Sequence, residues 1–271
     1  LGFNIGSQRK VEDALLANDS IEVGIRYDEV NEVETFEGVV DGHNTKFLRV
    51  DKVSVPLLDM LNEAKRVAGT YKRLPIKGVK GLTSAEKLPE NLVKGILRYQ
   101  NDISVFRDGT IRYDMVDITM THFKPSEIGL SVEKAKELGY DVETENDVLE
   151  LYPQDIVLPE NCVDKLIGTT KYLDDLLVKL YGLEPFYNCE TKEDLMGHLM
   201  MGLAPHTSGA ILCRIVGVAD IKGHYGHPFF HAAKRRNCDG DIDSVLFLLD
   251  GLINFSRSYL LSYKPSRYFI S

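Results

Sequence analysis

Three carboxylates stand at alternate positions in the segment Asn237 to Asp243, directly after the basic run Lys234 to Arg236. Residues i, i+2 and i+4 of an extended strand point to one face, so Asp239, Asp241 and Asp243 are expected to converge. Convergent carboxylates repel one another unless a cation neutralises them, and hard divalent cations prefer oxygen ligands. The spacing therefore predicts a magnesium site.

Two other interpretations of the acidic segment have to be weighed against a magnesium site. Asp and Gly are common in turns, so the segment could be a solvated loop that binds nothing. The acids also match the first three ligand positions of an EF-hand loop. However, Ser244 stands at the sixth position, where that loop needs Gly, and Asp250 replaces the bidentate Glu at the twelfth. The spacing disfavours calcium and leaves the other two interpretations open.

Histidines precede the acidic segment with the spacings HxxH and HxxxH. Imidazole and thiolate are zinc ligands, so His224, His227 and His231 could bind zinc together with Cys238. The aromatic insert Pro228 to Phe230 and the short spacing between the cysteine and the acids match no standard zinc framework. A structural role for these side chains is favoured, and zinc is not expected in this segment.

Composition limits the function classes that the chain can belong to. The 271 residues are 44% hydrophobic, which is enough for a substantial core, and no apolar run approaches the roughly 20 residues of a membrane helix. Four separated cysteines without a CxxC pair indicate a reduced, cytoplasmic setting. The net charge of −9 argues against nucleic-acid binding by the whole surface, so local basic patches would have to do it. The first residue is Leu1, without a secretory signal, and we expect a fragment.

Hydrophobic periodicity, caps and turn residues predict a mixed α+β chain whose strands are mostly antiparallel. The expected elements are helices at 7–16, 55–68, 160–181, 191–201 and 244–259, a short helix from Ser131 closed by Gly139, strands at 21–27, 34–40, 46–50 and 211–219, a hairpin at 103–113 around Asp108-Gly109, and a loop at 77–82. We expect three regions: an N-terminal segment at 1–70, a connecting region at 71–200 and a catalytic region at 201–271 that carries the acids.

Several longer segments are similar to one known family. The run from His227 to Asp241, HPFFHAAKRRNCDGD, resembles the catalytic segment of the large subunit of archaeal family D DNA polymerase. The segments Gly182–Asn188, Gly202–Ser208, Asp108–Asp114 and Thr121–Phe123 resemble the same subunit. The resemblance covers about residues 77 to 259, and the long run is far more specific than a bare Asp-x-Asp pattern.

The resemblance implies an active site built from double-psi β-barrels, related to that of multisubunit RNA polymerases, and DNA synthesis from dNTPs at a primer 3′-hydroxyl with Mg²⁺, or with Mn²⁺ as the alternative ion. It assigns metal binding and catalysis to Asp239 and Asp241, support to Asn237, Gly240 and Asp243, and DNA or nucleotide contact to Lys234, Arg235, Arg236, His227 and His231. One of the three basic residues could instead neutralise the acids, and each histidine could instead be satisfied inside the protein.

The chain departs from the family pattern in three places. A lysine motif of the first barrel is expected upstream of Leu1, residues 26–47 lack the cysteines of a zinc ribbon, and residues 256–271 differ from the usual continuation, so the barrel is expected to be incomplete. The resemblance implies a small exonuclease subunit and, through regions outside this chain, a sliding clamp as partners, and no membrane. The chain alone is expected to be inactive. An RNA-polymerase-like nucleotidyltransferase and a non-catalytic metal-binding or scaffold fragment are the alternatives.

Overall fold

The computed structural model describes residues 20–54, 56–70, 90–106, 108–205, 207, 209–237 and 239–255. The helix predicted at 7–16 and the loop predicted at 77–82 lie outside these residues. The chain divides into two compact units. The first unit contains residues 1–109, 175–184 and 254–271, and the second contains residues 110–174 and 185–253.

The first unit contains a small antiparallel sheet, as predicted. Strands β1 (Ser20–Asp28) and β5 (Lys46–Ser54) pair along their length, β2 (Val33–Thr35) adds a third strand, and β3 (Val39–Val40) pairs with β4 (His43–Asn44). Where a zinc ribbon would place cysteines, Arg26 donates to the hydroxyl and carbonyl oxygens of Thr45 at 2.8 and 2.6 Å. Helices α2 (Leu57–Val67), predicted from its periodicity, and α3 (Leu92–Gln100) belong to the same unit, which also includes residues 175–184.

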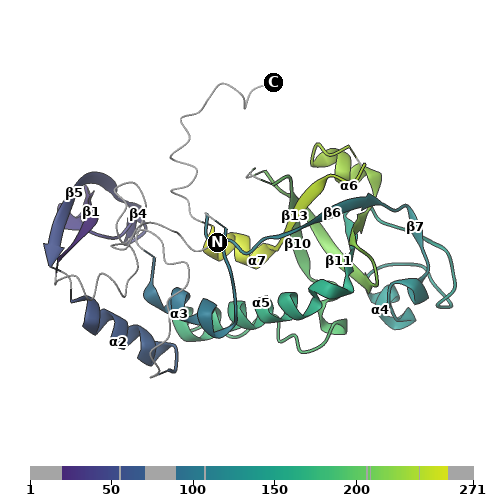
Figure 1. The fold of residues 1–271 in the computed structure, drawn as a ribbon, viewed down its shortest axis with the longest axis horizontal. Helices are drawn as coiled ribbons and strands as arrows, with labels where there is room; N and C mark the ends of the chain where they lie inside the picture. Colours follow the sequence, from purple (N-terminus) through teal and green to yellow (C-terminus); the bar gives the residue numbers. More distant parts are fainter. Residues whose placement is uncertain are drawn as a thin grey trace. The chain divides into compact units, whose positions relative to one another are not determined.

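The second unit is built around a closed barrel of six strands in the order β10-β11-β9-β12-β6-β13. Of these, Figure 1 labels β6, β10, β11 and β13. Two neighbouring pairs are parallel, β9 with β11 and β6 with β12, and the other pairs are antiparallel. The strands are β6 (Tyr113–Thr119), β9 (Asp155–Pro159), β10 (Leu199–Leu203), β11 (Ile211–Ala219), β12 (Gly223–Gly226) and β13 (Ile242–Phe247). The predicted α+β class is confirmed, and the mixed barrel is consistent with part of a double-psi catalytic core. Its strands come from both sides of residue 200.

The remaining elements connect or follow the barrel strands along the chain. Helix α4 (Val132–Glu137) begins at Ser131, whose hydroxyl accepts a hydrogen bond from the Lys134 amide at 3.1 Å, and Gly139 ends its turn at φ +98°, as predicted. The helix predicted at 160–181 is also present. The other elements are a 3₁₀ turn at Pro125–Glu127, β7 (His122–Phe123) paired with β8 (Leu149–Glu150), a 3₁₀ turn at Glu160–Cys162, α5 (Val163–Leu176) and its π-helical end Leu177–Tyr181, α6 (Pro228–Ala233) and α7 (Leu248–Asn254).

The hairpin predicted around Asp108-Gly109 is wrong. The Gly109 amide bonds to the Phe106 carbonyl at 2.9 Å, so a turn is present, but the described residues on either side of it form no paired strands. Ile103, Val105 and Ile111 are all buried, and their alternation therefore reflects irregular chain with buried apolar side chains. Strand β6 begins only at Tyr113 and pairs with β12 and β13.

Two predicted helices also have to be corrected. In the segment 191–201, the Asp194 carboxylate accepts a hydrogen bond from the Thr191 amide at 2.8 Å, but only one 3₁₀ turn (Glu193–Leu195) follows before β10 begins. In the segment 244–259, β13 occupies the start and α7 runs only from Leu248 to Asn254. A strand buried on both faces is a continuous apolar run, which periodicity cannot distinguish from a buried helix. No helix in the described part of the chain is long and apolar enough to cross a bilayer.

Candidate metal-binding loop

The acidic segment lies in the connection from α6 to β13. His227 begins α6, and its Nδ1 accepts a hydrogen bond from the Phe229 amide at 3.2 Å. After this short helix the chain turns through Arg235, whose φ is +61°, and the Arg236 amide bonds back to the His231 carbonyl at 2.9 Å. Because of this turn, three consecutive basic residues enter different environments.

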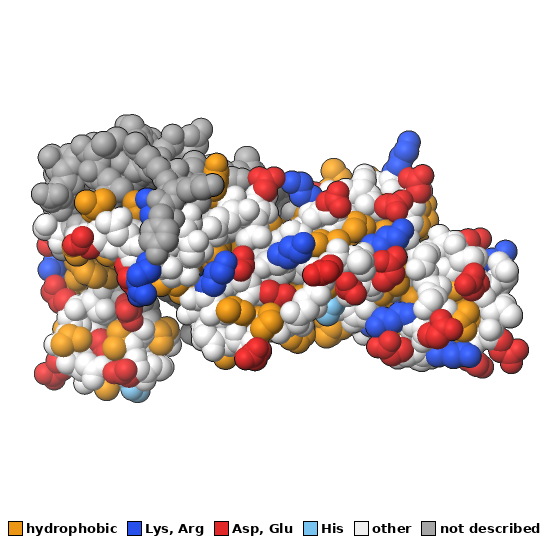
Figure 2. Space-filling model, turned by 90° about the horizontal axis from the view of Figure 1, so that it is seen from below, with side chains coloured by type: hydrophobic (Ala, Val, Ile, Leu, Met, Phe, Trp, Pro, Cys, Tyr) orange, Lys and Arg blue, Asp and Glu red, His pale blue; other side chains and the backbone are white. Residues whose placement is uncertain are grey.

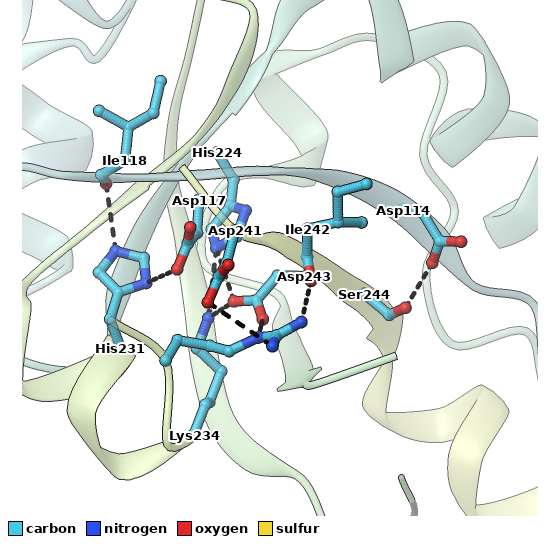
Figure 3. A network of polar contacts seen from close by, with 11 residues as sticks. Asp114, Asp117, Ile118, His224, His231, Lys234, Asp241, Ile242, Asp243 and Ser244 are labelled. Carbon is cyan, nitrogen blue, oxygen red and sulfur yellow. Dashed lines mark hydrogen bonds and ion pairs between the residues drawn. The ribbon is translucent and has the colours of Figure 1, made fainter. Parts of the chain in front are cut away.

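Lys234 points into the barrel. Its side chain is fully buried, and its ammonium group forms an ion pair with Oδ2 of Asp243, which is also fully buried (Figure 3). The same nitrogen lies 3.4 Å from Nε2 of His224 and 4.2 Å from the centre of the Phe230 ring. Lys234 is therefore the cation that neutralises an acid, which was the alternative to a phosphate contact.

Arg236 connects two of the acids. Its Nε lies 3.0 Å from Oδ1 of Asp243, and one terminal nitrogen lies 3.7 Å from Oδ2 of Asp241. The other terminal nitrogen donates to the Ile242 carbonyl. The guanidinium group is thus held from three sides, and its side chain is only 21% exposed. Arg235, by contrast, is exposed.

The three acids do not form one convergent set. Strand β13 begins only at Ile242, because Gly240 turns the backbone at φ +92° just before it. Asp239 is exposed on this loop together with Asn237, whereas the Asp241 side chain is 38% exposed and Asp243 is buried. The Asp241 backbone carbonyl accepts a hydrogen bond from the Asp117 amide at 2.9 Å, which ties the loop to β6.

These positions decide which carboxylates fit a divalent cation. Asp239 and Asp241 are within two residues of each other, accessible, and supply the hard oxygen ligands that Mg²⁺ prefers. Asp243 does not fit, because Lys234 and Arg236 already occupy both of its oxygens. In exposure and ligand chemistry, Asp239 and Asp241 therefore suit a divalent cation.

Two buried histidines, His224 and His231, lie close to these charged side chains. Nδ1 of His231 is 3.3 Å from Oδ2 of Asp117, outside hydrogen-bond geometry, and its Nε2 is 3.1 Å from the Ile118 carbonyl (Figure 3). Burial, followed by the charge of Lys234, holds the pKa of His224 well below its usual value and also lowers the pKa of His231. Both rings are therefore neutral near pH 7, so their contacts with carboxylates are not imidazolium salt bridges.

The proposed zinc ligands are not brought together as a set. His224, His231 and Asp243 place ligand atoms within 4.8 Å of one another, but the ammonium group of Lys234 already contacts Asp243 and His224. A positive charge at that position opposes a metal ion. His227 caps α6 instead, and Cys238 lies outside the described residues.

Three residues of this network were missed by sequence reasoning. Asp114 and Asp117 lie on β6, and Ser244 on β13 donates a hydrogen bond to Asp114 (Figure 3). Asp117 is fully buried, and both of its carboxylate oxygens have no hydrogen-bond partner in the described structure. The sequence signal for them was an acid within the β-rich segment Tyr113 to Thr119, and the incorrect hairpin prediction concealed this strand.

A groove of about 510 Å³ lies beside β6 and β13 on the same unit. Its lining includes the basic residues Arg112 and Lys222 and the acid Asp114, together with Ile242, which follows Asp241 directly. Elsewhere charges are mixed: on the face seen in Figure 2, acidic and basic side chains alternate and form no broad basic field.

The closed mixed barrel and its acid-bearing loop are consistent with part of a catalytic core of the double-psi type, and comparison with known proteins identifies the family. Residues 69–267 match the family described as DNA polymerase II large subunit DP2, catalytic domain. The chain belongs to this family, which confirms the resemblance found in the HPFFHAAKRRNCDGD run.

Relatives from several archaea have similar sequences, all described as DNA polymerase II large subunit. The chain is 52% identical to the Archaeoglobus fulgidus protein over 217 residues, which cover 77% of this chain and 19% of the relative. It is 46% identical to the Methanothermobacter thermautotrophicus protein over 267 residues, which cover 95% of this chain and 24% of the relative. It is 50% identical to the Pyrococcus furiosus protein over 224 residues, which cover 80% of this chain and 18% of the relative. The chain thus spans about a fifth of the length of these relatives.

Proposed function

We propose that this chain carries the metal-binding catalytic loop of a replicative DNA-directed DNA polymerase, which transfers nucleotides from dNTPs to a primer 3′-hydroxyl. The observation that carries the proposal is the separation of the acids: Asp239 and Asp241 remain accessible at the start of β13, while Asp243 is neutralised inside the barrel. Family membership supports the same reaction, because the relatives are described as DNA polymerase subunits.

Asp239 and Asp241 would hold the divalent cation, Mg²⁺ or Mn²⁺. When bound in such sites, divalent cations lower the pKa of the primer hydroxyl and stabilise the leaving pyrophosphate. The protein's part is positioning. Gly240 lets the loop turn without a Cβ, and the hydrogen bond from the Asp117 amide to the Asp241 carbonyl fixes the loop against β6.

DNA contact falls to the basic residues that remain open to solvent. Lys234 is excluded by its buried ion pair, so Arg235 is the member of the basic run that can reach a phosphate. Arg112 and Lys222, in the groove beside β6 and β13, add two further cations close to Ile242. Arg binds phosphate with its planar fork and Lys as a point charge.

The proposed partners follow from the same family. The relatives are described as large subunits, and we propose that a small exonuclease subunit and a sliding clamp bind to the complete protein, the clamp through regions outside this chain. Because the chain spans about a fifth of its relatives, we expect it to be inactive when isolated.

Primer extension by the complete large subunit with its small subunit tests the proposal. Asp239→Asn and Asp241→Asn should each reduce the extension rate by at least about 100-fold, because a neutral amide is a poor ligand for Mg²⁺. Lys192 is an exposed lysine distant in sequence from the acids, and Lys192→Gln, the control, should leave the extension rate unchanged. Unchanged extension in both Asp variants would reject the assignment. Preference for ribonucleotides over deoxynucleotides would instead support the RNA-polymerase-like alternative.

A further inference from the structure

Arg236 occupies an unusual position between the buried and the accessible acids. Its Nε contacts Oδ1 of Asp243 at 3.0 Å, and it also donates to the Ile242 carbonyl. These contacts fix the guanidinium group against the start of β13. Its remaining terminal nitrogen faces Oδ2 of Asp241 at 3.7 Å, on the side where the accessible loop begins.

The charges in this cluster explain why one cation is shared between two acids. Asp243 has a second partner, the buried ammonium group of Lys234, so it does not depend on Arg236 alone. Asp241 has no other ion pair in the described residues. Without Arg236, the carboxylates of Asp241 and Asp243 would repel each other across the start of β13.

We propose that Arg236 is a positioning residue that holds the Asp241 carboxylate in place before the metal binds, and that its charge sets how tightly the loop binds a divalent cation. This inference rests on the proposed function of Asp241 as a metal ligand. Arg236 is therefore not a DNA-phosphate contact, because Asp243 and the Ile242 carbonyl retain its guanidinium group at the barrel.

The two parts of this role have opposite effects on a variant. Removing the positive charge of Arg236 takes away repulsion toward an incoming dication, so metal binding should become tighter. Removing its contact with Asp241 also takes away orientation, so nucleotide transfer at saturating metal should become slower, because small misplacements of reacting groups cost large factors in rate. A residue that only stabilised the fold would not tighten metal binding.

The barrel offers a matched control pair. Arg214 contacts the buried Asp155 with distances of 2.9 and 2.7 Å, and its side chain is 26% exposed, close to the 21% of Arg236. Asp155 and Arg214 lie on β9 and β11, whereas the acidic loop leads into β13. Arg214→Gln should therefore remove a comparable ion pair without changing metal affinity.

The first experiment measures Mn²⁺ binding to the complete large subunit by electron paramagnetic resonance of the free ion. Binding that is lost in Asp241→Asn defines the site. Arg236→Gln should bind Mn²⁺ at this site about fivefold more tightly than the wild type, as expected for one nearby charge in a solvated setting. The difference should shrink toward zero in 1 M salt, because the Debye length falls to about 3 Å. Arg214→Gln should match the wild type.

The second experiment measures primer extension by the complex with the small subunit at saturating Mn²⁺. Arg236→Gln should be at least about tenfold slower than the wild type. Arg236→Lys should keep the wild-type Mn²⁺ affinity but also extend slowly, because a lysine cannot reach Asp241, Asp243 and the Ile242 carbonyl together. Arg236→Lys also keeps the test valid if Arg236→Gln fails to fold.

Specific results would overturn the inference. Unchanged or weaker Mn²⁺ binding in Arg236→Gln would contradict the role of its charge, and wild-type extension by Arg236→Lys would contradict positioning. An equal gain in affinity in Arg214→Gln would show a general loosening of the barrel. If Asp241→Asn changes neither Mn²⁺ binding nor extension, the proposed function itself is wrong, which is a distinguishable outcome.

Discussion

Replacing Lys234 with Met should open the barrel locally, because it leaves a carboxylate buried without its closest cation. The side chains of Lys234 and Asp243 are both fully buried. Removing one partner of a buried ion pair costs about 3–5 kcal/mol. Since Arg236 still contacts the other oxygen of Asp243 at 3.0 Å, we expect the lower end, about 3 kcal/mol, which corresponds to roughly a 100-fold larger population of the open state.

Hydrogen–deuterium exchange of the complete large subunit measures this change at β6 and β13, which pair through Asp243 and Met115. Amides of these strands should exchange about 100-fold faster in Lys234→Met. Lys192→Met is the matched control, because its 3.1 Å ion pair with Glu160 is 39% and 56% exposed. An exposed pair contributes about 1 kcal/mol or less, so protection should change less than about fivefold.

A double variant separates the ion pair from packing. Lys234→Met with Asp243→Leu removes both buried charges and should lose less protection than Lys234→Met alone, because no buried carboxylate is left uncompensated. If Lys234→Met alone kept the same exchange protection as Lys192→Met, the reasoning would be refuted. A double variant that is less protected than either single variant would show that packing, and not charge, decides the effect.

Three further predictions test the surroundings of the site. Burial lowers the pKa of His224, so the unfolded ring takes up a proton first and stability should fall, by up to about 1.4 kcal/mol per pH unit, as pH drops below about 6.5. The thermal midpoint of His224→Gln should change less with pH than that of the wild type, and an equal slope of midpoint against pH would contradict this. A Cβ on Gly223 would lie 2.3 Å from the Val116 carbonyl oxygen, so Gly223→Ala should lower the free energy of unfolding by about 2 kcal/mol. Gly209→Ala, with open space around it, should not lower it, and equal thermal midpoints for the two variants would refute the close approach. Burial raises the pKa of Cys213 to about 12, so native protein at pH 8 should label at this thiol far more slowly than denatured protein, as peptide mass spectrometry can measure.

Elements with local signals could be predicted from the sequence. The helix beginning at Ser131 has its cap and its closing Gly139 within nine residues, and the long helix ends at Gly182, whose φ is +65°. Strand β11 matches the predicted range 211–219 because a short apolar run is bounded by turn residues on both sides. In each case the deciding contacts lie close together along the chain.

Barrel closure could not be predicted in the same way. Val116 on β6 pairs with Gly223 on β12 and with Ile242 on β13, and both partners lie more than about a hundred residues further along the chain. The segment 199–203 becomes a strand because β11 and β13 both pair with it, although the preceding Asp194 begins a helical turn. Long-range pairing therefore overrode local signals that favoured a hairpin and a helix.

The acidic segment shows the same limit at the level of chemistry. Alternate spacing treats Asp239, Asp241 and Asp243 as equivalent, and repulsion among them predicted a neutralising cation. For Asp243 that cation is supplied by Lys234 and Arg236 of the α6 connection, because the barrel buries the carboxylate where both can reach it. A buried carboxylate that two internal cations neutralise does not favour metal binding, whereas an accessible pair of carboxylates beside one shared arginine does. Under the proposed function, the start of the strand therefore decides which acids stay open to a metal, and Gly240 sets that point.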